Sequence, residues 1–145
     1  MNYDEILLND SSKKSFILGL IRLAKADGVI SDEERQYFVG SAGYLSLSEN
    51  DISIINNAII SDDDIVFDFE SPLEKVFFFR EGIQLCAVDT KYDDAERAEI
   101  RKMAAELSVP LKIIESIEAW VEEGMSWRSR GDDLLSSCAS ELAQK

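Results

Sequence analysis

The sequence predicts an all-α fold. Only two prolines and seven glycines interrupt its 145 residues, and apolar residues recur at spacings of three and four over most of its length. The one stretch with strand-like alternation has no partner strand elsewhere. Hydrophobic residues make up 46% of the chain, enough to form a core, and the length is typical of a single domain. We therefore expect one compact helical domain over residues 1–145, with about seven helices.

The first three helices are predicted from apolar stripes and from residues that cap helix ends. Their expected ranges are 12–27, 31–42 and 48–60. Ser11 or Ser12 is expected to cap the first helix. Ser31, with Glu34 three residues later, has the spacing of a capping box at the start of the second helix, and Gly43 is expected to end it.

A loop and two central helices follow. Residues 62–70 are expected to form a loop, with its three consecutive aspartates in solvent. The next helix, 71–88, is apolar nearly all round, so it belongs at the centre of the molecule, with Phe77, Phe78 and Phe79 in the core. Asp93, followed by Glu96 three residues later, opens the helix that ends near residue 107.

The C-terminal region is predicted to form two more helices, 110–124 and 132–143. Gly124 is expected to end the first of them. Trp120 and Trp127 are interpreted as packing residues for these helices; if they are exposed, they would anchor a partner protein.

Composition excludes several classes of protein. The net charge of −14 argues against a nucleic-acid groove, which needs a basic face. The chain has no histidine, which excludes Ser-His-Asp triads and HExxH zinc sites. Cys86 and Cys138 are too few for a disulfide scaffold and are interpreted as buried thiols. With neither a signal-like start nor a span-length apolar segment, we expect a cytoplasmic protein without direct membrane insertion.

An internal repeat is the main feature of the sequence. Residues 21–35 (IRLAKADGVISDEER) align with residues 83–97 (IQLCAVDTKYDDAER) at an offset of 62. The alignment pairs six identical residues: Ile21 with Ile83, Leu23 with Leu85, Asp27 with Asp89, Asp32 with Asp94, Glu34 with Glu96, and Arg35 with Arg97. Each copy reads as a helix end, an acidic turn and a new helix. We expect two pseudo-symmetric helix-turn-helix units.

The repeated acids allow two interpretations. In the first, Asp27 and Asp89 only build turns, the glutamates only cap helices, and Arg35 and Arg97 pair with the aspartates. In the second, an aspartate at a negative helix C-terminus needs a compensating cation. Oxygen ligands without histidine then favour Ca²⁺ or Mg²⁺. The turn 27–34 resembles the second half of an EF-hand loop, and Gly28 suits a left-handed helix stop, but Leu23 and Lys25 occupy the first ligand positions, so it is not an EF-hand.

The two runs LAKADGVISDEERQYF (23–38) and CAVDTKYDDAERAEIRKMAAELSVP (86–110) resemble the tellurite-resistance TerB family of bacteria. The resemblance covers residues 16–110 and fades over the C-terminal helices, 111–145. It implies an all-helical domain that binds metal through its repeated acids and serves in membrane-associated stress-response complexes. Carried onto this sequence, the implied metal ligands are Asp27, Glu34, Asp89 and Glu96. Thr90 stands where the family has glycine in the second motif.

These observations lead to a ranked set of functional hypotheses. The first is a non-enzymatic TerB-like domain that binds a divalent cation and acts as a sensor or scaffold in a stress-response complex. The alternative is a metal-free protein-interaction adaptor that uses the acidic loop 62–70 and the C-terminal helices. A mimic of DNA and an enzyme rank lower, because the acids cluster at turns and no activated nucleophile or cofactor motif accompanies them.

Overall fold

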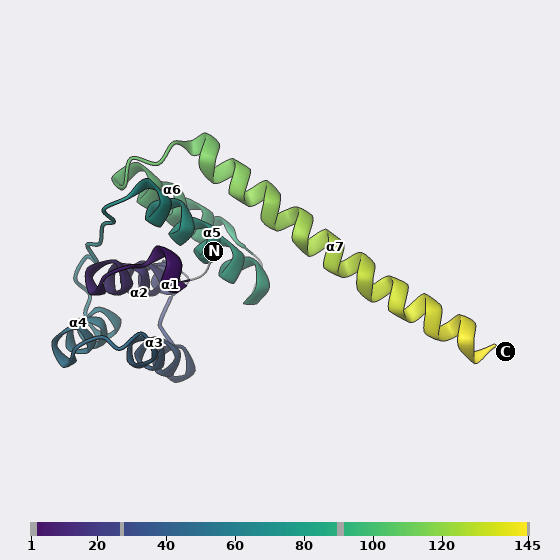
Figure 1. Ribbon diagram of the computed structural model, residues 1–145, viewed down its shortest axis with the longest axis horizontal. Helices are drawn as coiled ribbons and strands as arrows, with labels where there is room; N and C mark the ends of the chain where they lie inside the picture. Colours follow the sequence, from purple (N-terminus) through teal and green to yellow (C-terminus); the bar gives the residue numbers. More distant parts are fainter. Residues whose placement is uncertain (1–2, 27, 90–91, 145) are drawn as a thin grey trace.

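The computed structural model describes residues 3–26, 28–89 and 92–144, and these residues form helices and loops without a strand, as the sequence predicts. The elements are α1 (Tyr3–Ile6), α2 (Asp10–Ala26), α3 (Asp32–Tyr44), α4 (Glu49–Ile60), α5 (Pro72–Asp89), α6 (Asp94–Glu106) and α7 (Leu111–Ala143). Figure 1 shows α1–α6 gathered into one cluster, from which α7 runs away diagonally. The seven predicted helices omitted the single turn α1 and divided α7 in two.

The core forms around α5, as its nearly continuous apolar surface predicts. Phe77, Phe78 and Phe79 are all buried, and α5 contacts α1, α2, α6 and α7. The approach of α2 to α5 depends on Gly19, because a Cβ at that position would lie 2.4 Å from the ring of Phe78. A methyl group there would overlap the ring, so glycine sets the separation of the two central helices.

The start of α2 differs from the prediction. Helix α2 begins at Asp10, and the Asn9 side chain caps it by accepting a hydrogen bond from the Ser12 backbone N–H at 2.8 Å. Ser12 lies inside the helix and is buried, and its hydroxyl donates to the carboxylate of Glu74 on α5 at 2.9 Å. Ser12 therefore links two helices. The cap predicted at Ser11 or Ser12 is wrong, because Asn9 caps the helix instead.

Two glycines that were expected to end helices behave differently. Gly28 has φ of 132°, in the region that favours glycine, and it follows the end of α2 as predicted. Gly43 lies inside α3, which continues to Tyr44, and the positive φ after this helix belongs to Ser46, at 59°. The loop predicted over 62–70 is confirmed, and its three aspartates are exposed.

The C-terminal region is one helix, so the prediction that Gly124 ends a helix is wrong. Nothing lies within 4 Å of a Cβ built at Gly124 or Gly131, so neither glycine marks a close approach within the chain. An exposed glycine costs a helix only ~1 kcal/mol relative to alanine, and no proline or capping motif follows either one to stop the helix. In Figure 1, α7 continues unbroken to the C-terminal end.

Each copy of the repeat comprises the end of one helix and the capped start of the next, namely α2 with α3 and α5 with α6. The pseudo-symmetric packing of these two units stays a prediction. Across the parts of the chain that are described, none of the helices combines the length and apolar character that crossing a bilayer requires.

Candidate functional site

The two acidic turns form the same local structure, a reciprocal capping box. Ser31 Oγ accepts from the Glu34 backbone N–H, and Glu34 Oε1 accepts from the Ser31 N–H, both at 3.1 Å. Asp93 Oδ1 accepts from the Glu96 N–H at 2.8 Å, and Glu96 Oε1 accepts from the Asp93 N–H at 3.2 Å. Both capping boxes predicted from the sequence are therefore confirmed.

The structure brings the two capping glutamates to one cavity. This cavity has a volume of about 590 Å³ and lies between α2, α3, α5 and α6. Its walls are mostly apolar, with Leu20, Leu23 and Leu85 among them, and Glu34 and Glu96 both line it. Glu96 is only 5% exposed, whereas Glu34 is exposed. Two carboxylates from matched positions of the repeat thus share a mainly apolar space.

The four-residue metal set predicted from the resemblance is only partly described. Asp27 and the side chain of Asp89 lie outside the described residues. One oxygen of each capping glutamate accepts a backbone hydrogen bond. Within the described part of the chain, no three histidine, cysteine, aspartate or glutamate side chains are grouped so that they could hold a metal ion. The set Asp27, Glu34, Asp89 and Glu96 stays a prediction.

The two repeat arginines make contacts that the sequence did not indicate. Arg35 Nη2 donates to Asn56 Oδ1 on α4 at 3.4 Å. Arg97 Nη1 lies 3.0 Å from a carboxylate oxygen of Glu118 on α7, and its guanidinium stacks 4.2 Å from the ring centre of Tyr92. The pairing of these arginines with Asp27 and Asp89, which the sequence allowed, falls on residues that the structure leaves undescribed.

Glu118 fastens α7 to α6. Arg101 donates to both of its carboxylate oxygens, at 3.1 and 2.8 Å, in addition to the bond from Arg97. Burial alone would raise the pKa of the Glu118 carboxyl, but the hydrogen bonds from Arg101 and the positive charges of Arg101 and Arg97 outweigh it and hold the pKa below its usual range. Burial, together with the negative Glu118, raises the pKa of the Tyr92 hydroxyl. We call Arg97, Arg101 and Glu118 the α7 clamp.

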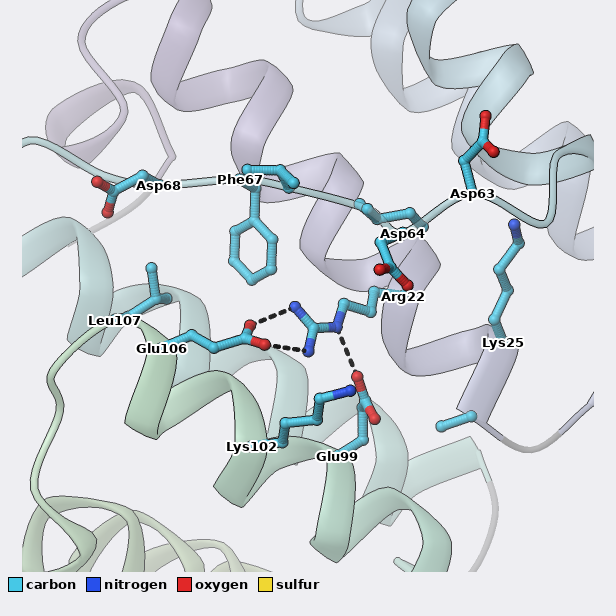
Figure 2. A pocket seen from close by; sticks show the side chains of 13 residues that line it. Arg22, Lys25, Asp63, Asp64, Phe67, Asp68, Glu99, Lys102, Glu106 and Leu107 are labelled. Carbon is cyan, nitrogen blue, oxygen red and sulfur yellow. Dashed lines mark hydrogen bonds and ion pairs between the residues drawn. The ribbon is translucent and has the colours of Figure 1, made fainter.

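A second charged cluster ties α2 to α6. Figure 2 shows the guanidinium of Arg22 between the carboxylates of Glu99 and Glu106, with two bonds to Glu106 and one to Glu99. The ring of Phe67 faces the same guanidinium, and its centre lies 6.0 Å from Arg22 Cζ. These bonds occupy the guanidinium of Arg22. We therefore interpret the cavity that Arg22 lines as part of the contact between α2 and α6.

The most unusual surface is the distal half of α7, residues 122–144. All of these residues are exposed, although the stretch carries Met125, Trp127, Leu134, Leu135 and Leu142. The proximal half instead buries Ile114, Ile117 and Val121. Several large apolar side chains exposed along one helix are typical of a surface that binds another molecule.

Three side chains of α7 differ from the environment that the sequence predicted for them. Trp120 and Trp127 were interpreted as packing residues, but they are 50% and 72% exposed. Cys138 was interpreted as a buried thiol and is exposed, whereas Cys86 is buried as expected. The unbroken spacing of apolar residues across Gly124 and Gly131 was the signal for one long helix.

No family model matches the chain, and neither the curated proteins nor the solved structures contain a match to it.

Proposed function

We propose that this protein is a non-enzymatic interaction adaptor that binds a partner protein through the distal half of α7. The observation that carries this proposal is the exposed apolar surface over residues 122–144. This choice favours the adaptor hypothesis over the cation-dependent sensor, because exposed large apolar side chains are typical of a protein-binding surface. The resemblance to TerB supports a further proposal, that the partner belongs to a bacterial stress-response complex.

The energetics of an isolated helix support this assignment. The distal half is about twenty residues long and includes Gly124 and Gly131, each of which weakens a helix by roughly 1 kcal/mol relative to alanine. In proteins, most of the stability of a helix comes from tertiary packing of its apolar face and less from the intrinsic preference of its residues. A partner that covers the apolar face would supply the packing that the rest of the chain does not.

Charge narrows the class of partner. The stretch 122–144 contains five acidic and two basic residues, so it is repelled by an anionic membrane surface. The exposed aspartates of the 62–70 loop add negative charge elsewhere on the molecule. A protein with a complementary apolar surface, flanked by charges that pair with those of this stretch, would suit it.

Affinity capture with matched variants tests this proposal. Trp127→Glu places a charge on the apolar face, and Ser129→Glu places the same charge on the opposite face of the same helix. We expect the wild type and Ser129→Glu to capture the same proteins from a bacterial lysate, and Trp127→Glu to lose them. Equal capture by both variants would show that the distal half of α7 is not the binding surface.

The divalent cation site is a second candidate, favoured by the position of Glu34 and Glu96 at one cavity. We propose that Ca²⁺ or Mg²⁺ binds there with Asp27 and Asp89. A ligand at a hundred-fold excess over its Kd stabilises the folded state by ~2.7 kcal/mol, so the melting temperature of chelator-treated protein should rise when the ion is added. The rise should disappear in Asp27→Ala plus Asp89→Ala. No rise with either ion, or the same rise in the variant, rejects the site.

A further inference from the structure

From Trp120, near the end of the proximal half, to Cys138 in the distal half, α7 carries a repeating pattern of large and small side chains. Positions spaced alternately by four and three residues share one face of the helix: Trp120, Gly124, Trp127, Gly131, Leu134 and Cys138. Large side chains alternate with glycine or cysteine along this series, which we call the α7 seam. A Cβ at either glycine would have no neighbour within 4 Å, so Gly124 leaves open space between the two tryptophans and Gly131 leaves open space between Trp127 and Leu134.

We propose that the α7 seam pairs with the seam of a second copy of this chain, with the two helices antiparallel. The proposal rests on the assignment of this surface as the binding site, and it names the partner. In an antiparallel pair, the two kinds of seam position face one another, so each tryptophan can meet a glycine. Trp127 then lies opposite Gly124 of the second copy, and Trp120 lies opposite Gly131 of the second copy.

The alternative orientation packs less well. In a parallel pair, each seam position faces its own equivalent, which sets tryptophan against tryptophan and glycine against glycine. Layers with two indole rings would be crowded, and the layers between them would hold cavities at the glycines. Since cavities and overpacking both destabilise packed surfaces, the size pattern favours the antiparallel arrangement.

Charges beside the seam support the same register. Glu123 and Arg130 are seven residues apart and flank the seam on one side. When Trp127 faces Gly124 of the second copy, Glu123 lies next to Arg130 of that copy, and symmetry repeats the pair. The residues of a closed two-fold contact are thus complementary to themselves in both size and charge, as a homodimer requires.

The area and the location of the surface are compatible with a dimer. At 50% and 72% exposure, the two tryptophans of one copy expose roughly 200–300 Å². Two copies together would bury on the order of 500 Å² through tryptophan, a small contact beside the ~1,200 Å² of stable interfaces, so we expect a reversible equilibrium between monomer and dimer. In Figure 1, the α1–α6 cluster lies at one end of α7, so an antiparallel pair holds the two clusters at opposite ends.

Sedimentation velocity of the full chain over a range of concentrations tests the pairing. We expect a monomer–dimer equilibrium for the wild type and for Ser129→Glu, whose substitution lies on the opposite face. Trp127→Glu should be monomeric at every concentration. Gly131→Leu should also be monomeric, because the leucine side chain fills the space that Trp120 of the second copy would occupy. This loss is expected even though leucine favours the helix more than glycine does. An unchanged melting temperature at low concentration shows that each variant retains its fold.

Disulfide trapping tests the orientation. In the Cys138→Ser background, mixing Glu123→Cys with Arg130→Cys should give a cross-linked heterodimer under mild oxidation, and neither variant alone should cross-link to the same extent. Rapid self-cross-linking of wild-type Cys138 would indicate parallel helices and overturn the proposal. A wild type that is monomeric at all concentrations also overturns the proposal. Co-sedimentation of that monomer with phosphatidylcholine vesicles would then show that α7 binds a lipid surface instead of a second copy.

The outcome for this pairing is separable from the outcome for the proposed function. If the chain is monomeric but captures another protein in a Trp127-dependent manner, the pairing is wrong and the adaptor assignment stands. If the chain dimerises equally well with Trp127→Glu, the pairing is wrong, and the capture experiment alone decides the assignment of this surface.

Discussion

The two halves of α7 differ in their surroundings far more than in their composition. The proximal half, residues 111–121, packs against α5 and α6 and is held there by the α7 clamp. The distal half continues the helix, and all its described residues are exposed. An apolar stripe therefore indicates that a helix face will be covered, but not which molecule covers it.

The largest expected difference between the halves is in the free energy of unfolding. Ile114 is fully buried, so Ile114→Ala should destabilise the domain by about 2–5 kcal/mol through lost contacts and a cavity. Leu134 is 64% exposed, so Leu134→Ala should change the stability of the dilute protein by no more than about 0.5 kcal/mol. Urea unfolding of the two variants at low concentration measures both values, and similar losses would mean that the distal half packs on the domain.

Glycine substitutions sharpen the same comparison. Gly19→Ala should destabilise the protein by roughly 1–3 kcal/mol, because the new methyl group overlaps the ring of Phe78. Gly124→Ala meets no atom within the chain and should stabilise the distal helix by up to ~1 kcal/mol. Thermal melts report the first effect, and the helical signal in far-ultraviolet circular dichroism of the dilute protein reports the second. A loss of helix in Gly124→Ala would contradict the open environment of that glycine.

The α7 clamp lies at the border between the two halves and gives a smaller, pH-dependent effect. Glu118→Gln should cost about 1 kcal/mol at neutral pH, because two arginines lose a charged partner. The pKa of Glu118 is lowered by folding, so its stabilisation is present above about pH 4.5 and is lost as the pH falls through the lower folded-state value. The stability curves of wild type and Glu118→Gln should therefore converge in acid.

Substitution of Glu115, an exposed glutamate on the same helix, serves as the control for the clamp. Glu115→Gln should leave both the stability and its pH dependence near those of the wild type. A Glu118→Gln curve that stays parallel to the wild-type curve at low pH would show that the carboxylate charge is not what fastens α7.

Sequence patterns predicted those parts of the fold that depend on neighbouring residues. The capping boxes at Ser31 and Asp93 were predicted correctly, because each uses residues only three positions apart. The α7 helix was divided at Gly124, because the cost of one exposed glycine is too small to decide between a stop and a continuation. The length of α7 depends on the sum of many small preferences and on packing.

The parts of the sites that depend on distant residues were less predictable. The bonds of Arg22 to Glu99 and Glu106 join residues 77 and 84 positions apart, and no local pattern indicates them. The repeat did indicate that Glu34 and Glu96 occupy matched turns, and the structure places both at one cavity. The exposure of Trp127 could not be predicted, since an apolar stripe is equally compatible with a buried helix.

The central claim is that the distal half of α7 depends on a partner, and amide hydrogen exchange of the full chain at several concentrations tests it most directly. In dilute protein, we expect the amides of residues 124–143 to exchange much faster than those of residues 113–121, because only the latter are in a packed helix. Protection of the distal amides should then rise with protein concentration, while that of the proximal amides stays constant. Equal and concentration-independent protection of both halves would contradict the claim.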